Sequence, residues 1–256
     1  MTVSYKTCGL VIWFNPKEQE VENLSQHLKY FDDFVIVDNS DIDNKILLDR
    51  IGTDCRIKYI PLLNNEGIAY ALNIGCQSAI DMKYDWILTL DQDSYFDVGQ
   101  LDKYFCCIQS KLDDSSIAVF SSSRKEDVKE GYQSLVITSG NILSLKAYKD
   151  VSGFDNALFI DEVDFDMCFK LQKYGYKIFQ FKDVILNHNL GENYNERMLF
   201  NKKVRVMNHS PLRKYYIFRN RLVIRSRYPQ YRELYTRSVI LFFLTTLFFE
   251  RKKLVS

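Results

Sequence analysis

The sequence predicts an α/β protein with a mostly parallel central sheet flanked by helices, followed by a basic helical extension. Short apolar runs that end in polar turns alternate with segments in which apolar residues recur at helical spacing. Such alternation is typical of parallel sheets, whose ligands bind beyond the carboxyl ends of the strands. The charge distribution predicts the extension. Residues 1–196 carry 19 basic and 31 acidic side chains, whereas residues 197–256 carry 15 basic and two acidic ones.

The first part of the chain reads as alternating strands and helices. Strands are expected over residues 8–14, 34–37, 57–60 and 86–90, and helices over residues 21–30 and 68–80. Three of the strands run directly into polar residues, namely Asn15-Pro16, Asp38-Asn39-Ser40 and Asp91-Gln92-Asp93. Because parallel strands end at one edge of a sheet, these residues are candidates for a shared site.

The second part of the chain is less regular. Strands are expected over residues 117–121 and 134–145, and a helix over 163–174 that stops at Gly175. After His188 the chain becomes basic and is expected to be helical.

The sharpest chemical signal is the pair Asp91 and Asp93, which directly follows a hydrophobic strand. Two carboxylates two residues apart can converge on one divalent cation. Mg²⁺ or Mn²⁺ prefers such oxygen ligands and usually binds diphosphate oxygens beside them. His188 leaves two interpretations open, either a structural histidine or a further metal ligand from a third segment.

A second acidic group stands at the start of the expected helix 163–174. Asp161, Glu162, Asp164 and Asp166 lie within six residues. One of these carboxylates can act as a general base that takes the proton of an attacking hydroxyl. Alternatively, the group is a charged first turn that favours the helix dipole. The residues alone leave both interpretations open for Asp161 and Glu162.

The polar loop 64–67 precedes the expected helix 68–80 and contains Asn65 and Gly67. Polar residues at such a junction commonly cap a helix. The amino end of a helix can also bind phosphate or ribose.

Taken in order, these motifs resemble the family 2 glycosyltransferases, which have the GT-A fold, a Rossmann-like arrangement, and invert the anomeric carbon. The matching segments are VDNS (37–40), NNEGIAYALNIG (64–75), LTLDQDS (88–94), SGNILS (139–144), GFDNALFIDEVDFDMCFKLQKYGYKI (153–178) and HNLGE (188–192). The resemblance covers roughly residues 8–225 and is greatest to bacterial rhamnosyltransferases of O-antigen and capsule polysaccharide assembly. LDQDS, the I-D-x-V-D core at 160–164 and P-L-R-K-Y-Y-x-x-R-N at 211–220 suggest this subgroup.

The resemblance implies roles for the strand-end residues. Donor contacts are implied for Phe14, Asn15, Asp38, Asn65, Gly67, Asp91 and Asp93, with Asp38 reading the pyrimidine base. Asp91 would approach ribose or metal, Asp93 would be the principal metal ligand, and His188 would bind metal or diphosphate. The implied cofactor is Mg²⁺ or Mn²⁺.

The resemblance also implies a base and an acceptor site. Many relatives carry Glu-Asp where this chain has Asp161-Glu162, so either residue can be the base, and the subgroup pattern favours Asp161. Acceptor or diphosphate contacts are implied for Asp164, Arg213, Tyr216 and Arg219. The expected catalytic domain covers 1–195, with a nucleotide-binding half (1–95) and a catalytic half (96–195). The basic helical region covers 196–256.

The implied reaction is that of a hexosyltransferase, which moves a sugar from a nucleotide-sugar to a lipid-diphosphate-linked oligosaccharide. The favoured donor is dTDP-rhamnose, and a UDP-hexose is the alternative. Six cysteines without a C-x-x-C pair and a polar start to the chain favour the cytoplasm.

The basic tail leaves three interpretations. The apolar run 239–249 would be about 17 Å long as a helix, whereas a bilayer core is about 30 Å thick, so it should not span a membrane. Together with the arginines that precede it, between positions 219 and 237, it predicts a peripheral anchor on the inner face of the cytoplasmic membrane. A core or homodimer helix is an equal alternative. Nucleic-acid binding is disfavoured because the acidic remainder of the chain would repel a polyanion.

Overall fold

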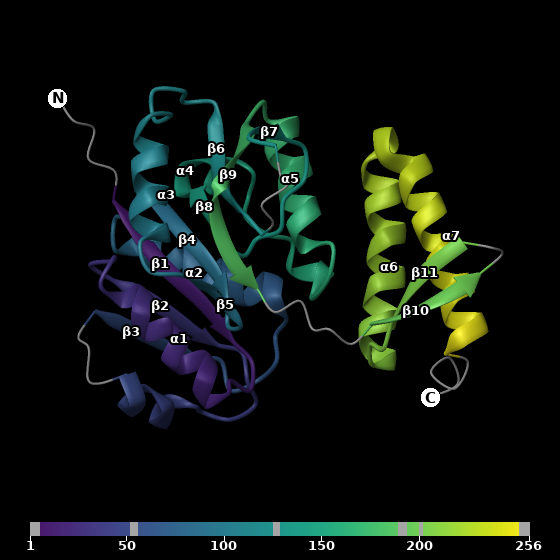
Figure 1. Ribbon diagram of the computed structural model, residues 1–256, viewed down its shortest axis with the longest axis horizontal. Coiled ribbons are helices and arrows are strands. Elements are labelled where there is room, and N and C mark those ends of the chain that lie inside the picture. The colour runs from purple at the N-terminus through teal and green to yellow at the C-terminus, as the bar shows by residue number, and fades with distance from the viewer. Residues whose placement is uncertain (1–5, 52–55, 125–128, 189–193, 200–201, 251–256) are drawn as a thin grey trace. The chain divides into compact units, whose positions relative to one another are not determined.

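The computed structural model describes residues 6–51, 56–124, 129–188, 194–199 and 202–250 (Figure 1). Its contacts divide the chain into two units. The sheet unit comprises Met1–Ala157 and Asp164–His188, and the C-terminal unit comprises Leu158–Val163 and Asn189–Ser256. The sequence predicts that the catalytic domain ends at residue 195 and that the basic region begins at residue 196. The structure instead groups the acidic segment Leu158–Val163 with the C-terminal unit, because side chains of that unit hold it.

The sheet unit is built on a nine-stranded sheet among the described residues, with the order β3-β2-β1-β4-β8-β6-β9-β5 and with β7 beside β9. The strands are β1 (Thr7–Trp13), β2 (Phe34–Asp38), β3 (Ile57–Pro61), β4 (Trp86–Asp91), β5 (Ser94–Phe96), β6 (Ile117–Ser123), β7 (Gly131–Gln133), β8 (Asn141–Ser144) and β9 (Lys177–His188). All of these strands run in one direction except β5, β7 and β8. The mixed α/β fold class with a largely parallel sheet is confirmed.

Helices cover both faces of this sheet, because successive strand residues point to opposite sides. Val11 and Trp13 share one apolar core with residues of α1 (Glu18–Leu28) and α3 (Gln100–Gln109). Leu10, which precedes Val11, lies against Gly75 of α2 (Ile68–Asp81) on the other face. The remaining helices of the unit are α4 (Leu145–Asp150), α5 (Val163–Lys173) and the short 3₁₀ segments η1 (Lys45–Ile51) and η2 (Asn156–Leu158).

One expected strand is wrong in its extent. The sequence predicts a strand over residues 134–145, but β8 covers only Asn141–Ser144. Gly140 has a φ of 80° and turns the chain immediately before β8, and the Ser144 hydroxyl then caps α4. A left-handed residue at 140 and a capping serine at 144 therefore shorten the strand at both ends.

The C-terminal unit combines a hairpin with two helices. Strands β10 (Tyr194–Leu199) and β11 (Lys202–Met207) pair antiparallel, and α6 (Pro211–Arg227), η3 (Pro229–Tyr231) and α7 (Arg232–Phe249) follow. The expectation of helix from residue 196 onward is therefore wrong at its start. Val204 and Val206 are buried while Lys203 and Arg205 are exposed, which is the period-two alternation of a strand. Across the described ranges, no helix combines the length and apolar character that crossing a bilayer requires.

Candidate functional site

The polar strand ends of the sheet unit lie at one edge of the sheet. In the register of β1 with its two parallel neighbours, Trp13 is opposite Asp38 and Ile12 is opposite Asp91. The loops that follow β1, β2 and β4 therefore begin side by side. This edge is defined here as the donor edge.

Asp38 is a buried polar residue of the donor edge. It is fully buried, and its Oδ1 accepts hydrogen bonds from the backbone N–H and the hydroxyl of Ser40. Its Oδ2 accepts from the backbone N–H of Asn44 at 3.1 Å, from the Asn44 side-chain amide at 2.9 Å and from the Tyr59 hydroxyl at 2.6 Å. Burial, followed by the bond to Asp38, raises the pKa of Tyr59. Asp38 thus organises the loop after β2. Its contact with the pyrimidine base of a nucleotide remains a prediction.

Hydrogen bonds join the loop after β1 to both neighbouring loops. The backbone N–H of Phe14 donates to Oε1 of Gln92 at 2.7 Å, and that of Asn15 donates to the Ser40 hydroxyl at 2.7 Å. Asn15 has a φ of 48°, so the chain turns sharply there. The Phe14 side chain is exposed, and its contact with a nucleotide remains a prediction.

The loop before α2 is joined to the same edge. The Asn39 side chain donates to Oδ1 of Asn65 at 3.1 Å and accepts from the backbone N–H of Glu66 at 2.8 Å. Gly67 occupies the N-cap position of α2 with a φ of 88°, a conformation that favours glycine. Asn65 and Gly67, both predicted from the loop 64–67, thus lie in one bonded loop system with Asn39 of the segment 37–40.

Asp91 is the last residue of β4, Asp93 lies in the turn between β4 and β5, and both are partly buried. The Asp91 backbone N–H donates to the Ser139 hydroxyl at 2.9 Å, and that hydroxyl donates to the Ser94 hydroxyl at 2.8 Å. The register of β5 with β9 places His188 opposite Ser94, next to Asp93 in sequence. The His188 side chain lies outside the described residues.

The donor edge fits a divalent cation that takes part of its coordination from a ligand. Among the described side chains, no group of three or more His, Cys, Asp and Glu lies close enough to hold a metal ion by itself. Two carboxylates at one strand end nevertheless form the oxygen donor set that Mg²⁺ or Mn²⁺ uses beside diphosphate oxygens. Asp91 and Asp93 are the residues that would hold such an ion.

The second acidic site lies in the C-terminal unit, in the segment Leu158–Val163, defined here as the base loop. Phe159, Asp161 and Glu162 have φ values of 63°, 62° and 63°, a left-handed conformation that side chains disfavour. Such backbone strain persists only where the surroundings hold it, and it clusters at functional sites.

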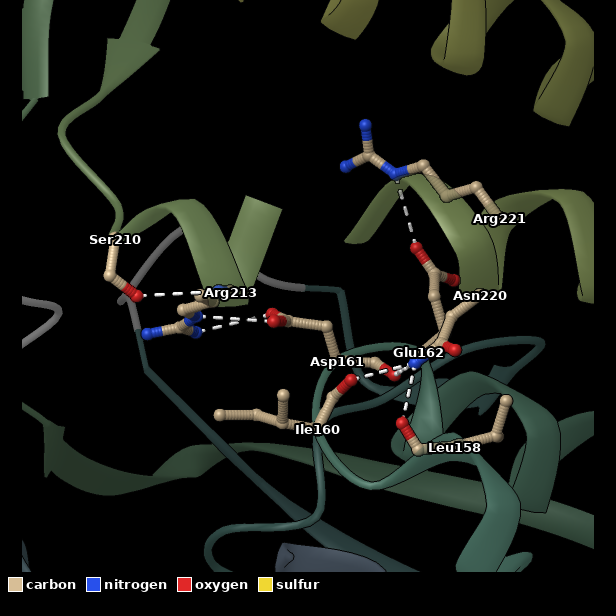
Figure 2. Close-up of polar contacts among 8 residues, drawn as sticks. All are labelled: Leu158, Ile160, Asp161, Glu162, Ser210, Arg213, Asn220 and Arg221. Atoms are coloured by element: carbon tan, nitrogen blue, oxygen red, sulfur yellow. Dashed lines mark hydrogen bonds and ion pairs between the residues drawn. The ribbon is translucent and has the colours of Figure 1, made fainter. Parts of the chain in front are cut away.

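The two candidate bases have different environments (Figure 2). Arg213 binds both carboxylate oxygens of Asp161 at 3.1 Å, and the Asp161 side chain stays 22% exposed. The Glu162 side chain is only 7% exposed, is paired with Arg221 at 3.3 Å and accepts from the Tyr235 hydroxyl at 2.7 Å. Burial raises the pKa of Glu162, while Tyr235 and Arg221 act in the opposite direction.

The other residues of the predicted acceptor set occupy different places. Tyr216 stacks on Phe159, with ring centroids 4.7 Å apart, and the Arg219 guanidinium lies 4.7 Å from the Tyr216 ring centroid. Asp164 belongs to the sheet unit and accepts from the Thr138 hydroxyl there. Their contacts with an acceptor remain predictions.

Sequence reasoning missed three residues that shape the base loop. Asn220, Arg221 and Tyr235 all bond to it from more than fifty positions away along the chain. The segment 211–220, which suggests the subgroup, ends in Arg219-Asn220, so the resemblance itself contains a signal for Asn220. Nothing in the sequence marked Tyr235, whose contact depends on the packing of α7 on α6.

Comparison with known proteins places these features in context. Residues 20–164 match the profile described as glycosyl transferase family 2. A dTDP-rhamnosyl transferase of Shigella flexneri, RfbF, is 25% identical over 240 positions, which cover 84% of this chain and 78% of that protein.

Solved structures agree on the fold. The S. aureus TarS 1–349 structure superposes with a TM-score of 0.55 at 16% identity over 71% of this chain, and its complex with UDP gives 0.54. The longer TarS structure gives 0.57 at 16% identity over 96% of this chain. The chain spans 59% of the shorter and 44% of the longer TarS chain. The profile match covers more than half of the chain and includes Asp38, Asp91, Asp93 and Asp161. The chain therefore belongs to glycosyl transferase family 2, with a GT-A fold.

Proposed function

We propose that this protein transfers an L-rhamnosyl group from dTDP-rhamnose to a hydroxyl of a lipid-diphosphate-linked saccharide, with inversion at the anomeric carbon. The observation that carries the donor is the similarity to the Shigella flexneri dTDP-rhamnosyl transferase over 84% of the chain. The family match supports sugar transfer from a nucleotide-sugar. A UDP-sugar donor is the second candidate, favoured by the TarS structure that contains UDP.

The donor edge supports nucleotide binding in the proposed reaction. The exposed Phe14 ring would pack against the base, and the loops of Asn15, Asp38 and Asn65 would hold the nucleoside. Asp91 and Asp93, with His188 as a further ligand, would hold Mg²⁺ or Mn²⁺. That ion would offset the negative charge that develops on the leaving diphosphate.

We assign the general base to Asp161 rather than Glu162. A base must reach the proton of the acceptor hydroxyl. The Asp161 carboxylate is partly exposed, whereas Glu162 is buried between Arg221 and Tyr235. In the proposed step the acceptor oxygen bonds to the anomeric carbon as the bond to the diphosphate oxygen breaks. The acceptor proton passes to Asp161, and dTDP leaves with the electron pair.

Arg213 is proposed to bind an acceptor phosphate as well as Asp161. Its side chain is 44% exposed, and a guanidinium carries five N–H donors, of which the Asp161 carboxylate uses two. A phosphate oxygen that took over one of those donors would loosen the pair and free an Asp161 oxygen to accept a proton.

A donor panel tests the proposed function. Binding and hydrolysis of dTDP-rhamnose, UDP-glucose and UDP-N-acetylglucosamine would be measured with Mg²⁺, with Mn²⁺ and with chelator. We expect metal-dependent selection of dTDP-rhamnose. Selection of a UDP-sugar would keep the reaction type and discard the rhamnosyl donor, while no binding of any donor would reject both.

The exposed surface of α7, called here its outer face, supports the proposal that the acceptor is bound at a membrane. The exposed side chains of α7 include Leu234, Ile240, Leu241 and Phe243, whereas Thr245 and Thr246 are buried, with exposures of 7% and 3%. A helix that faces water has the opposite arrangement. Exposed arginines occur on α7 itself, at positions 232 and 237, and at the last position of α6, residue 227. Apolar side chains beside cations suit the interface of an anionic bilayer, where we propose that this face binds.

Vesicle flotation separates this proposal from a homodimer. The wild-type protein should float with phosphatidylglycerol vesicles and less with phosphatidylcholine vesicles, and the Leu241→Ser, Phe243→Ser double variant should lose flotation. The control is Leu63→Ser, an exposed leucine of the sheet unit. Equal flotation of all proteins would reject the membrane surface. A wild-type dimer in sedimentation that the double variant abolishes would assign the face to a second copy instead.

A further inference from the structure

We propose that α6 acts as a template for the base loop, and that Asn220 is the positioning residue that fixes the backbone carrying Asp161. The inference rests on the proposed function of Asp161 as the base. Asn220 itself makes no proposed contact with donor or acceptor.

The base loop needs external support. Asp161 and Glu162 are consecutive left-handed residues, and Phe159 is a third. Each such residue costs about 1–2 kcal/mol relative to a right-handed conformation. A loop in water would relax from this conformation, so contacts from elsewhere in the C-terminal unit must select it.

Asn220 supplies that selection through the backbone of the loop (Figure 2). Its side chain is fully buried. The two N–H donors of its amide are shared by the carbonyl oxygens of Leu158 at 2.7 Å, Ile160 at 2.7 Å and Asp161 at 3.0 Å. Carbonyl groups that converge on one nitrogen can do so only if the chain curls around it. Asn220 is therefore specific for the curled loop, whatever side chains the loop carries.

The orientation of the Asn220 amide is itself determined. Its Oδ1 accepts from Nε of Arg219 at 2.9 Å and from Nη2 of Arg219 at 2.7 Å. The guanidinium can only donate and the loop carbonyls can only accept, so the amide cannot be turned over without losing both sets of bonds. The Arg219 Nη2 group also donates to the Leu158 carbonyl at 3.2 Å.

Other side chains of α6 contact the side chains of the base loop, as Asn220 contacts its backbone. Arg213, Tyr216 and Asn220 have the spacing i, i+3, i+7, which places them on one side of a helix. Tyr216 stacks on Phe159, Arg213 binds Asp161, and Arg221 binds Glu162. Each residue from Leu158 to Glu162 thus contacts α6, and the helix defines where the Asp161 carboxylate lies.

The test compares Asn220→Ala with Asn195→Ala, a control on the exposed surface of β10. A displacement of a catalytic group by about 1 Å can lower a rate about 10²-fold. We expect Asn220→Ala to lower kcat by about 10-fold to 100-fold while KM for the donor and Kd for dTDP change less than about twofold. The control should keep wild-type values.

Amide hydrogen exchange provides a readout that does not need activity. In Asn220→Ala, exchange should accelerate in peptides that cover residues 158–163 and stay unchanged in the central turns of α6 and α7. Acceleration throughout the C-terminal unit would show a general folding role and overturn the proposal, as would an unchanged kcat. If Asn220→Ala does not fold, Asn220→Ser, which keeps one donor, takes its place with the same criteria. Unfolding of that variant too would overturn the proposal. Wild-type protein that transfers no sugar would reject the proposed function. Hydrogen exchange in residues 158–163 would then still test whether Asn220 holds the base loop.

Discussion

Asp38 and Asp161 are loop carboxylates that the protein holds in different ways. Asp38 is buried at the end of β2; its partners Ser40 and Asn44 lie within six positions along the chain, and Tyr59 lies 21 positions away. Asp161 is partly exposed and depends on Arg213 and Asn220, more than fifty positions later. The first carboxylate shapes its own loop, whereas the second is presented by a helix. A buried, saturated carboxylate suits a structural role, and an accessible one suits proton transfer.

The sharpest test of this contrast compares the two adjacent acids of the base loop. Asp161→Asn should lower kcat by about 10²–10⁴-fold, because general-base catalysis contributes that much. Glu162→Gln should lower kcat far less and the melting temperature more, because it removes the charged partner of Arg221 in a buried site. Steady-state kinetics and thermal unfolding of both variants check this. The reverse pattern would move the base to Glu162.

Asp93→Asn tests the metal role of the donor edge. It should lower kcat by about 10²–10³-fold, the effect of removing one electrostatic stabiliser of developing charge. Turnover of the variant should also need more Mn²⁺ for half-saturation. Asp97→Asn, a nearby exposed carboxylate, is the matched control. Normal turnover with normal metal dependence in a folded Asp93→Asn protein would remove Asp93 from the site.

Asp38→Asn tests the structural side of the comparison. The new amide would face the donors of Ser40, Asn44 and Tyr59, so buried hydrogen bonds would be lost. Unfolding in urea should show a loss of about 2–4 kcal/mol, since hydrogen bonds to charged groups contribute about 1.5–3 kcal/mol each. The exposed Asp32→Asn provides the control. A loss of unfolding free energy below about 0.5 kcal/mol, together with abolished donor binding, would instead support direct contact of Asp38 with the pyrimidine base of the donor.

The smallest expected effect concerns His27 in α1, beside the sheet core. Its Nε2 accepts from the Phe96 backbone N–H at 2.9 Å, and burial lowers its pKa to about 4 from an ordinary 6.5. The unfolded chain therefore binds a proton at higher pH than the folded protein. Stability is greatest above pH 6.5 and falls by up to about 1.4 kcal/mol per pH unit as pH decreases toward 4.

His27→Gln keeps a neutral acceptor for Phe96 and removes the titration. Unfolding in urea at pH 7 and at pH 5 should show a smaller loss of stability for the variant than for the wild type. An equal loss in both proteins would assign the acid sensitivity to other groups.

The sequence by itself determined the fold class and the donor edge. Apolar runs that stop at Asp38 and Asp91 specify both the strands and the residues at their ends, because a strand and the turn after it are neighbours in the chain. The strands β5, β7 and β9 and the helices α3 and α4 were not predicted from the sequence. Three of these elements are only three to six residues long and carry little local signal, namely β5, β7 and α4.

Only the tertiary structure decided the base loop. Asp161 and Glu162 are adjacent in sequence and chemically alike, so local pattern could not separate them. Contacts from Arg213, Arg221 and Tyr235 leave one partly exposed and bury the other. The left-handed backbone was equally hidden, because it is stabilised by the distant Asn220 rather than by glycine. Local sequence specifies elements and their ends, while burial and long-range hydrogen bonds determine which of two chemically alike side chains stays accessible.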